Sequence, residues 1–541
     1  MPEVDPGPKG VSAHTDTFTK ENLPPLEQWP EMIWESNLLD YPAQLNCAVE
    51  LLTKAVERGW GDRPCVKSGD GSVAYTYGEL ERLSNQIART LVDDFGLVPG
   101  NRVLLHCFNN PYAVATWFAI VKAGGVVVAT MPLLRSGELR TIIDKSQIGL
   151  ALADHRLTDA VTDTDTGIRT VAYGDGSEGD LLTRAGSKGG EFQSVDTAAD
   201  DVVLLAFTSG TTGVPKCTMH FHRDVLAIAD IFQPVLQTTG DDVFCGSPPL
   251  AFTFGLGGLV IFPMRVGASS VLTEHPGPPL LAAIQGHSAT VCFTAPTAYR
   301  AMIDMMDEYD ITSLRKGVSA GETLPEPTFR AFLEATGVAL IDGIGSTEML
   351  HIFISASGDE IRPGATGKPL PGVTATIVGP DLEVLPPGEV GRLAVRGPTG
   401  CRYLNDERQS EYVQGGWNLT GDAYLVDEDG YFWFRARTDD MIISSGYNIA
   451  GPEVEASLLR HPAVSECAVV GVPDESRGHA IKAFVVLREE VEPSEAMAAE
   501  LQQFVKEDIA PYKYPRQVEF VESLPKTETG KVQRFRLRER G

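Results

Sequence analysis

Apolar and polar positions alternate in short blocks from about residue 45 to about residue 435. Residues 78–95 carry apolar side chains at helical spacing, and residues 102–108 form an apolar run of strand length. The same pair follows again, with a helix-like stretch at 113–124 and a strand-like run at 126–131. This repetition of strand and helix predicts a layered, largely parallel sheet with right-handed crossovers.

Several of the predicted strands end in small or polar residues. The buried run VVLLAF at 202–207 breaks into a glycine-rich loop, and similar breaks occur at 241–249, 290–296, 315–322 and 338–348. Open α/β sheets bind ligands beyond the carboxyl ends of their strands, so we expect these segments to converge on one crevice.

The sequence changes character after residue 370, where glycine and proline punctuate a β-rich region at 375–397. A charged RTDD segment at 437–440 then separates two apolar runs, and we expect the main domain boundary there. The predicted fold class is α/β. The large N-terminal domain, residues 1–437, combines layered βα subdomains with a small β-barrel-like subdomain, and residues 438–541 form a small mobile α+β domain.

The two ends of the chain have their own patterns. Residues 1–45 are rich in Pro, Asp and Thr and predict an irregular arm. In the C-terminal part we expect helices at 453–460 and 495–507 and strands at 466–471 and 481–487.

Composition argues against several classes of partner. The 541 residues include 45 Lys plus Arg against 73 Asp plus Glu, a net charge of -28, which disfavours general affinity for nucleic acid or anionic membranes. The most apolar stretch, 113–134, is interrupted by a lysine, a glycine pair and a proline, unlike a membrane span. The N-terminus lacks the apolar core of a secretory signal, and the eight cysteines form no CxxC pair. We expect a cytoplasmic monomer or homodimer with no nucleic-acid or membrane partner.

The segment FTSGTTGVPK at 207–216 has the composition of a phosphate-binding loop. Hydroxyls, flexible glycines and a final lysine together surround an anion. These residues are Thr208, Ser209, Gly210, Thr211, Thr212, Gly213 and Lys216. A Walker P-loop needs a different glycine spacing and a Ser or Thr after the lysine, where this chain has Cys217, and the dinucleotide pattern G-x-G-x-x-G is also absent. The loop is therefore expected to bind phosphate by another geometry.

Five motifs follow one another along nearly the whole chain. They are TSGTTGVPK (208–216), GSTE (345–348), TGD (420–422), RARTDDMIISSGYNI (435–449) and PKTETGK (525–531). With these motifs the chain resembles the adenylate-forming superfamily, which includes acyl- and aryl-CoA synthetases, luciferases and peptide-synthetase adenylation domains. The resemblance implies that a carboxylic acid and ATP form an acyl-adenylate and pyrophosphate with the help of Mg²⁺, and that coenzyme A then takes the acyl group.

The resemblance also implies catalytic roles for four residues. Thr347 matches a phosphate contact and Glu348 the magnesium ligand, a hard oxygen donor for a hard cation. Lys216 matches the lysine of the phosphate loop. Lys531 resembles a lysine that enters the active site from the small domain and bonds the acid's carboxylate and the α-phosphate. Such transfer needs positioning and charge neutralisation more than a protein nucleophile.

Further matches concern the nucleotide, the hinge and the thiol. Asp422 matches the acid that accepts both ribose hydroxyls, Arg437 an arginine for ribose or phosphate, and Asp439 the hinge of the small domain. The full ATP and AMP set implied is Thr208, Ser209, Gly210, Thr211, Thr212, Gly213, Lys216, Ala320, Gly321, Glu322, Asp342, Gly343, Ile344, Gly345, Ser346, Thr347, Asp422, Phe434, Arg437 and Lys531. The coenzyme A face implied is Ser444, Ser445, Gly446 and Tyr447.

Within the superfamily, three stretches look most like the benzoate and 2-aminobenzoate CoA ligase branch: PPLAFTFGLGG (248–258), SAGETLP (319–325) and DGIGSTEMLHIFIS (342–355). The acid pocket that this implies comprises Phe252, Thr253, Phe254, Gly255, Leu256, Ala320, Gly345 and His351. Flat aromatic walls beside small residues suit a planar ring better than a long alkyl chain. Thr253 and Phe254 depart from residues typical of benzoate-specific relatives, which points toward a substituted ring such as 2-aminobenzoate or salicylate. Ile344 gives aliphatic packing for adenine.

Other interpretations stay open at this stage. Phe252 and Phe254 could be ordinary core, and His351 a core histidine with satisfied hydrogen bonds. His220 and His222 alternate like a metal pair, but no third ligand is apparent, so a structural role is favoured. The alternative functions are an aryl-adenylate ligase that loads a free carrier protein and a binding homologue that has lost turnover.

Overall fold

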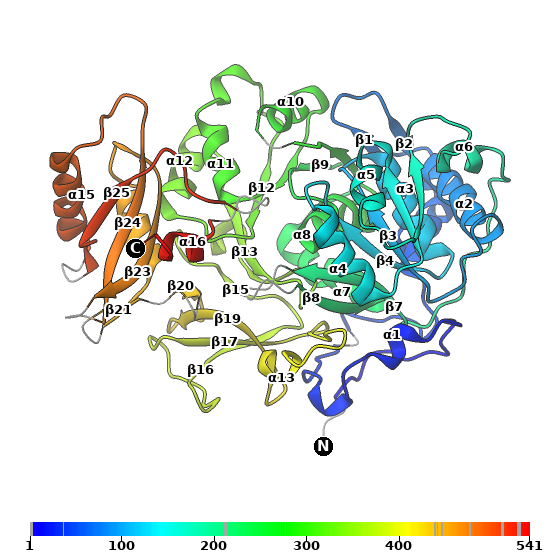
Figure 1. The fold of residues 1–541 in the computed structure, drawn as a ribbon, viewed down its shortest axis with the longest axis horizontal. Coiled ribbons are helices and arrows are strands. Elements are labelled where there is room, and N and C mark those ends of the chain that lie inside the picture. Colours follow the sequence, from blue (N-terminus) through cyan, green and yellow to red (C-terminus); the bar gives the residue numbers. More distant parts are fainter. Residues whose placement is uncertain are drawn as a thin grey trace.

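The computed structural model describes residues 4–35, 37–208, 215–275, 277–437, 440, 442–444, 447–474, 478–509, 513–526 and 532–540. Two largely parallel sheets form the body of the molecule (Figure 1). The six-stranded sheet has the order β6-β5-β3-β4-β7-β8, and the nine-stranded sheet has the order β15-β14-β13-β12-β11-β9-β10-β1-β2. The predicted α/β class and its layered parallel sheets are therefore confirmed.

The strands of the six-stranded sheet are β3 (Arg102–His106), β4 (Val126–Thr130), β5 (Leu150–Asp154), β6 (Arg169–Tyr173), β7 (Val202–Thr208) and β8 (Lys216–Phe221). Those of the nine-stranded sheet are β1 (Pro64–Ser68), β2 (Ala74–Thr76), β9 (Val243–Gly246), β10 (Ser269–Leu272), β11 (Val291–Thr294), β12 (Lys316–Ala320), β13 (Leu340–Gly345), β14 (Ile352–Ser355) and β15 (Lys368–Pro369). The helices of the body are α1 (Phe18–Glu21), α2 (Tyr77–Asp93), α3 (Pro111–Lys122), α4 (Ser136–Ser146), α5 (Thr158–Thr162), α6 (Leu181–Gly186), α7 (His222–Leu236), α8 (Thr253–Leu256), α9 (Phe262–Val266), α10 (Pro278–His287), α11 (Pro296–Ile303) and α12 (Glu326–Thr336).

Local sequence explains where these elements begin and which faces they bury. The helix α2 starts after Thr76 because Thr76 and Glu79 form a reciprocal capping box. The helix α3 starts at Pro111 behind the N-cap Asn110, and nearly all of its residues are buried because it contacts β1 of one sheet and β3 and β4 of the other. The largely apolar sequence of α3 thus reflects its position between the two sheets.

The strands β9, β11, β12 and β13 are parallel neighbours, so their carboxyl ends meet at one edge of the nine-stranded sheet. Four of the five broken apolar runs therefore meet as predicted, whereas the fifth, at 202–207, is β7 of the six-stranded sheet. Within the described residues, no helix is both long and apolar enough to cross a bilayer. All eight cysteines are buried and unpaired.

Two smaller sheets follow the body. The first is antiparallel and consists of β16 (Thr374–Val378), β17 (Gly391–Arg396), β18 (Val413–Gln414), β19 (Trp417–Val426) and β20 (Phe432–Arg437), with α13 (Gln409–Tyr412) beside it. The second contains β21 (Ile442–Ser444), β22 (Tyr447–Ile449), β23 (Val464–Asp474), β24 (Gly478–Leu487) and β25 (Gln517–Phe520), with α14 (Gly451–Leu458), α15 (Glu495–Asp508) and α16 (Arg534–Arg538). In Figure 1 this second sheet lies at the opposite end of the molecule from the six-stranded sheet. We keep a division into residues 1–437 and 438–541 as a proposal.

The N-terminal arm has little regular structure, as predicted, but it is packed against the body. The buried Arg223 at the start of α7 forms an ion pair with the buried Asp5 and donates to the Pro8 carbonyl at 2.8 Å. Ser12 and the Ala13 N–H both bond the Asp201 carboxylate. A buried arginine left without its carboxylate would be costly, so these contacts fix the arm to the body.

Candidate active site

The strands β7 and β8 carry the two ends of the predicted phosphate loop. Thr208 ends β7, Lys216 begins β8, and the two residues pair directly across the antiparallel ladder. The ammonium nitrogen of Lys216 lies 5.3 Å from the centre of the Tyr403 ring. Ser209, Gly210, Thr211, Thr212 and Gly213 lie outside the described residues, so their phosphate contacts stay predictions.

The GSTE turn connects β13 to β14 and is held by side chains from distant parts of the chain. The contacts join Tyr412 to Ser346 (3.3 Å between hydroxyl oxygens), His220 to the Thr347 carbonyl (2.8 Å), Tyr403 to the Glu348 carboxylate (2.5 Å) and Thr399 to the Met349 carbonyl (2.7 Å). Carbonyl and carboxylate oxygens only accept, so the His220 Nε2–H and the Tyr403 and Thr399 hydroxyls are the donors. The turn with the predicted phosphate and magnesium residues is thus fixed in place before any ligand binds.

The predicted ribose residues face each other on two paired strands. Asp422 on β19 lies opposite Arg437 at the end of β20, and the guanidinium donates to both the Asp422 carboxylate and the Thr420 carbonyl at 3.1 Å. Gly421 has φ 77°, and a Cβ there would lie 2.8 Å from the Arg437 guanidinium. Glycine is therefore required in the TGD triplet both for its conformation and for the approach of the arginine.

The predicted adenine segments lie side by side on β12 and β13. Ala320 pairs with Gly343, and Gly321 follows with φ 90° before Glu322. Gly345 has no room for a side chain, because a Cβ would lie 2.7 Å from the His351 backbone. Ile344 and Phe434 are half-buried and pack on the same hydrophobic cluster, in which the Phe434 ring contacts Tyr424.

Asp342 on β13 is the most perturbed acid of the predicted site. Its Oδ1 is buried and has no hydrogen-bond partner among the described residues. Burial raises the pKa of this carboxyl to about 8, although the bond from the Gly343 backbone opposes the shift. Burial therefore favours the protonated form of Asp342, which can donate as well as accept a hydrogen bond.

His351 lies at the centre of an aromatic cluster. Its ring centre is 4.5 Å from that of Phe262, 5.7 Å from Phe254 and 5.9 Å from Phe232. The residue is 3% exposed, and neither ring nitrogen has a hydrogen-bond partner among the described residues. Burial lowers the pKa of His351 to about 3, so the ring is neutral. The Phe254 backbone opposes this lowering, so it lies near the imidazole although it makes no hydrogen bond of ordinary geometry with it.

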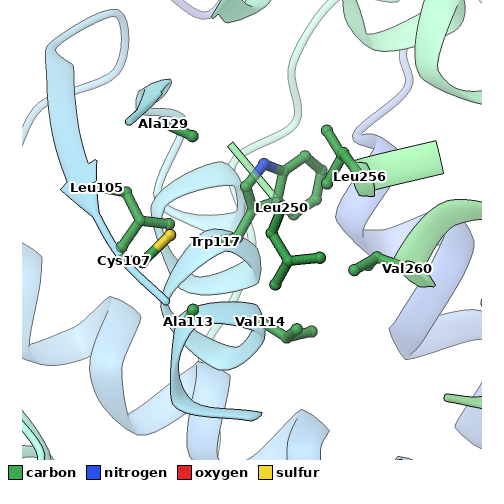
Figure 2. Close-up of a pocket in the computed structure, with 9 residues that line it drawn as sticks. All are labelled: Leu105, Cys107, Ala113, Val114, Trp117, Ala129, Leu250, Leu256 and Val260. Carbon is green, nitrogen blue, oxygen red and sulfur yellow. The ribbon is translucent and has the colours of Figure 1, made fainter. Parts of the chain in front are cut away.

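The helix α8 separates this cluster from a small apolar cavity. Leu256 lies on the cavity side with Trp117 and Leu250, as Figure 2 shows, whereas Phe254 packs against His351. Gly257, which follows Leu256, lies on the His351 side, because a Cβ there would lie 2.3 Å from the imidazole. The structure therefore brings Phe254, Gly345 and His351 together and puts Leu256 on the opposite side of the helix.

The rest of the predicted acid segment borders α8. Phe252 is the N-cap residue of α8, and Thr253 is buried as its first residue. Gly255 packs tightly on the loop before the helix, because a Cβ there would lie 2.1 Å from the Pro249 carbonyl. Asn109 holds this loop by donating to the Pro248 carbonyl and accepting from the Leu250 N–H, at 2.9 and 2.8 Å. These contacts fix the segment between the two sheets.

Lys531 and Asp439, the predicted catalytic lysine and hinge, lie outside the described residues. The residues on either side of Lys531 are described: Lys526 and Val532 form an antiparallel bridge, and the Arg534 guanidinium bonds both oxygens of Glu455 at 2.8 Å. The pKa of Arg534 is raised mainly by the charge of Glu455, and Asp440 and Glu322 add to it. Since Glu322 follows β12, its charge places Arg534 near a strand end of the body.

The predicted coenzyme A face is described only in part. Ser444 ends β21, is buried and pairs with Tyr447, whereas Ser445 and Gly446 lie outside the described residues. Asp440, next to the predicted hinge, forms a 2.8 Å ion pair with Arg538 of α16. Roles for this face and for the hinge stay predictions.

The residues present fit a magnesium ion that would be bound partly by a protein carboxylate and partly by the phosphates of ATP. Within the described ranges there is no group of three or more His, Cys, Asp or Glu side chains placed to hold a metal. Glu348 is buried, its Oε1 accepts from Tyr403, and its other oxygen has no hydrogen-bond partner in the described part of the chain. Mg²⁺ is commonly held by one carboxylate together with substrate phosphates, which is the donor set available here.

Within the described residues, His220 and His222 contact different groups and do not share a ligand. His220 bonds the Thr347 carbonyl, whereas Nδ1 of His222 accepts from the Cys47 N–H at 3.1 Å. Burial lowers the pKa of His222 to about 3. The pattern of alternation alone did not reveal that His220 contacts the GSTE turn.

The AMP-binding enzyme family model matches residues 52–403, and the model of the AMP-binding enzyme C-terminal domain matches residues 453–531. The chain belongs to the AMP-binding enzyme family. One relative of this AMP-binding enzyme is the benzoate–CoA ligase of Thauera aromatica, 35% identical over 510 residues, which cover 92% of this chain and 96% of the relative. Among solved structures, the anthranilate CoA ligase AuaEII in complex with anthranoyl-AMP is 34% identical with a TM-score of 0.88, covering 93% of this chain and 98% of that one. A benzoate CoA ligase from Burkholderia xenovorans LB400 is 31% identical with a TM-score of 0.84, covering 91% and 100%.

These relatives confirm the predicted superfamily and its benzoate and 2-aminobenzoate branch, and this AMP-binding enzyme is accordingly an acid–thiol ligase. Motif reading missed Tyr403, Tyr412 and Thr399, which hold the GSTE turn. They lie on a segment without a motif, and only the folded chain brings them beside the turn.

Proposed function

We propose that this chain is an AMP-forming aryl acid CoA ligase that acts on a ring-substituted benzoate of the 2-aminobenzoate or salicylate type. The observation that carries the proposal is His351: a buried, neutral imidazole among three phenylalanine rings, with no hydrogen bond of ordinary geometry to either nitrogen in the described structure. An aromatic acid would pack against these rings, and a ring substituent would give the imidazole its missing hydrogen bond. The names of the relatives, a benzoate–CoA ligase and an anthranilate CoA ligase, support the same class of acid.

The first half-reaction would join the acid to AMP. Lys216, Thr347 and the loop after Thr208 would hold the phosphates, while Asp422 would accept the ribose hydroxyls. Mg²⁺, held by Glu348 and the phosphates, would supply charge neutralisation at the leaving pyrophosphate. Lys531 would bring a further positive charge to the carboxylate and the α-phosphate. The GSTE turn supports this assignment, because hydrogen bonds from His220 and Tyr403 already hold Thr347 and Glu348 in place.

The second half-reaction would transfer the acyl group to coenzyme A. The small domain would turn about Asp439, withdraw Lys531 and present Ser444, Ser445, Gly446 and Tyr447 to the pantetheine. The adenylate has AMP as its leaving group, so the thiol can attack the carbonyl directly.

The test is a panel of acids assayed for AMP release with and without coenzyme A. Benzoate, 2-aminobenzoate, salicylate and a medium-chain fatty acid would be compared by kcat/KM. We expect coenzyme A-dependent release that is fastest with a substituted benzoate. Fastest turnover with the fatty acid would contradict the aryl assignment. AMP release only with a pantetheine-bearing carrier protein would favour the carrier-loading ligase, and no pyrophosphate exchange with any acid would favour a binding homologue.

A further inference from the structure

Tyr403 reaches the GSTE turn because residues 401–404 extend the six-stranded sheet. The Leu404 N–H donates to the Cys217 carbonyl and the Met219 N–H to the Arg402 carbonyl, both at 2.8 Å, and Thr218 forms a bridge with Tyr403. Successive side chains of an extended segment point to opposite faces. Arg402 accordingly points to the buried Asp224, at 2.9 Å, and Tyr403 points the other way, to Glu348.

The Tyr403 side chain is enclosed and makes two contacts with charged groups. It is 1% exposed, its hydroxyl donates to Glu348 Oε1 at 2.5 Å, and its ring lies 5.3 Å from the Lys216 ammonium. Tyr412 packs edge-on against the ring with 5.8 Å between centroids, which restricts ring rotation.

We propose that Tyr403 is a positioning residue for the magnesium ligand. By occupying Oε1 of Glu348, it holds the carboxylate so that the other oxygen is presented to a divalent cation bound with ATP. A hydrogen bond to a charged group contributes more than one between neutral groups, and a carboxylate with one oxygen fixed loses less rotational freedom when it binds metal. The inference rests on the proposed role of Glu348. It assigns a supporting role to Tyr403, which lies 55 positions from Glu348 in the sequence.

The effect of the hydroxyl can be separated from that of the ring by Tyr403→Phe. This variant keeps the aromatic face beside Lys216 and removes only the bond to Glu348. The matched control is Tyr299→Phe, which removes the hydroxyl of another fully buried tyrosine, one that donates to the Cys292 carbonyl at 2.7 Å in a different cluster. Glu348→Gln is the reference for loss of the ligand itself.

The measurement is ATP binding by calorimetry, without acid or turnover, in magnesium and in EDTA. The dissociation constant of ATP in EDTA divided by that in magnesium reports how strongly the metal strengthens ATP binding. The affinity of free ATP for Mg²⁺ is common to all variants and does not change the comparison. We expect Tyr403→Phe to reduce this ratio about tenfold, the effect of one bond to a charged group, and to leave ATP affinity in EDTA unchanged. Tyr299→Phe should match the wild type. In pyrophosphate exchange, the half-saturating magnesium concentration of Tyr403→Phe should rise while KM for the acid stays constant.

Two outcomes would overturn the inference. A wild-type or larger ratio in Tyr403→Phe, with a reduced ratio in Glu348→Gln, would show that the hydroxyl is neutral toward the metal or competes with it. An unchanged ratio in Glu348→Gln would remove the magnesium role of Glu348 and the inference with it. The proposed aryl acid specificity would survive either result, because it is decided by the panel of acids.

Discussion

The buried imidazole of His351 lowers the free energy of unfolding, so replacing it with an apolar side chain should raise that free energy. The change we choose is His351→Leu, which is close in volume and apolar. Burying a polar group without a partner costs about 1–3 kcal/mol, and losing edge contacts with phenylalanine rings costs about 0.5–1.5 kcal/mol. We therefore expect the variant to be more stable than the wild type by about 1 kcal/mol near pH 8, as measured by urea unfolding.

The difference should grow in acid, because the pKa of His351 is lowered to about 3 in the folded chain. An unfolded histidine titrates near 6.5, so the wild type loses stability as pH falls below that value while the folded ring stays neutral. At about pH 5 the proton taken up by the unfolded chain is worth about 2 kcal/mol. His351→Leu removes this term, so its advantage should rise from about 1 to about 3 kcal/mol.

The same variant should lose substrate discrimination. If a ring substituent bonds the imidazole, the ratio of kcat/KM for 2-aminobenzoate to that for benzoate should fall about 3- to 10-fold. The control is His222→Leu: His222 has an equally lowered pKa but accepts from the Cys47 N–H, so this variant should lose stability near pH 8 and keep the substrate ratio. Destabilisation of His351→Leu near pH 8 with an unchanged substrate ratio would refute the reasoning and return His351 to the ordinary core.

Four further changes test other parts of the site. Lys531→Ala should nearly abolish adenylation, measured by pyrophosphate exchange, and spare thioester formation from a supplied acyl-adenylate; equal loss of both would contradict its assigned role. Asp439→Pro should impair the thioester half-reaction more than adenylation, and equal rate constants for both halves would argue against rotation at the hinge. Asp422→Asn should raise KM for ATP about tenfold or more with little change in KM for the acid, since it weakens bonds made by a charged acceptor. Asp224→Ala leaves the fully buried Arg402 without its carboxylate and should cost about 3–5 kcal/mol in urea unfolding, whereas a loss below 1 kcal/mol would show that the ion pair is dispensable.

Local pattern carried much of the prediction of this fold. The helical spacing of apolar residues at 78–95 predicts α2, and the apolar runs that break into GSTE and SAGE predict β13 and β12. Each of these depends on residues a few positions apart, so spacing along the chain is enough to find them. The order of the five motifs added the family, and with it the predicted ligands.

The sequence by itself therefore determined the alternation of strands and helices and the family of this protein, and it predicted the candidate ligands. Only the tertiary structure decided what supports those ligands: Tyr403 beside Glu348, His220 beside Thr347, and Leu256 on the far side of α8 from His351. The first two pairs are 55 and 127 residues apart. Such a hydrogen bond depends on how two sheets pack and on which face an edge segment presents. The spacing of neighbouring residues in the sequence determines neither of these.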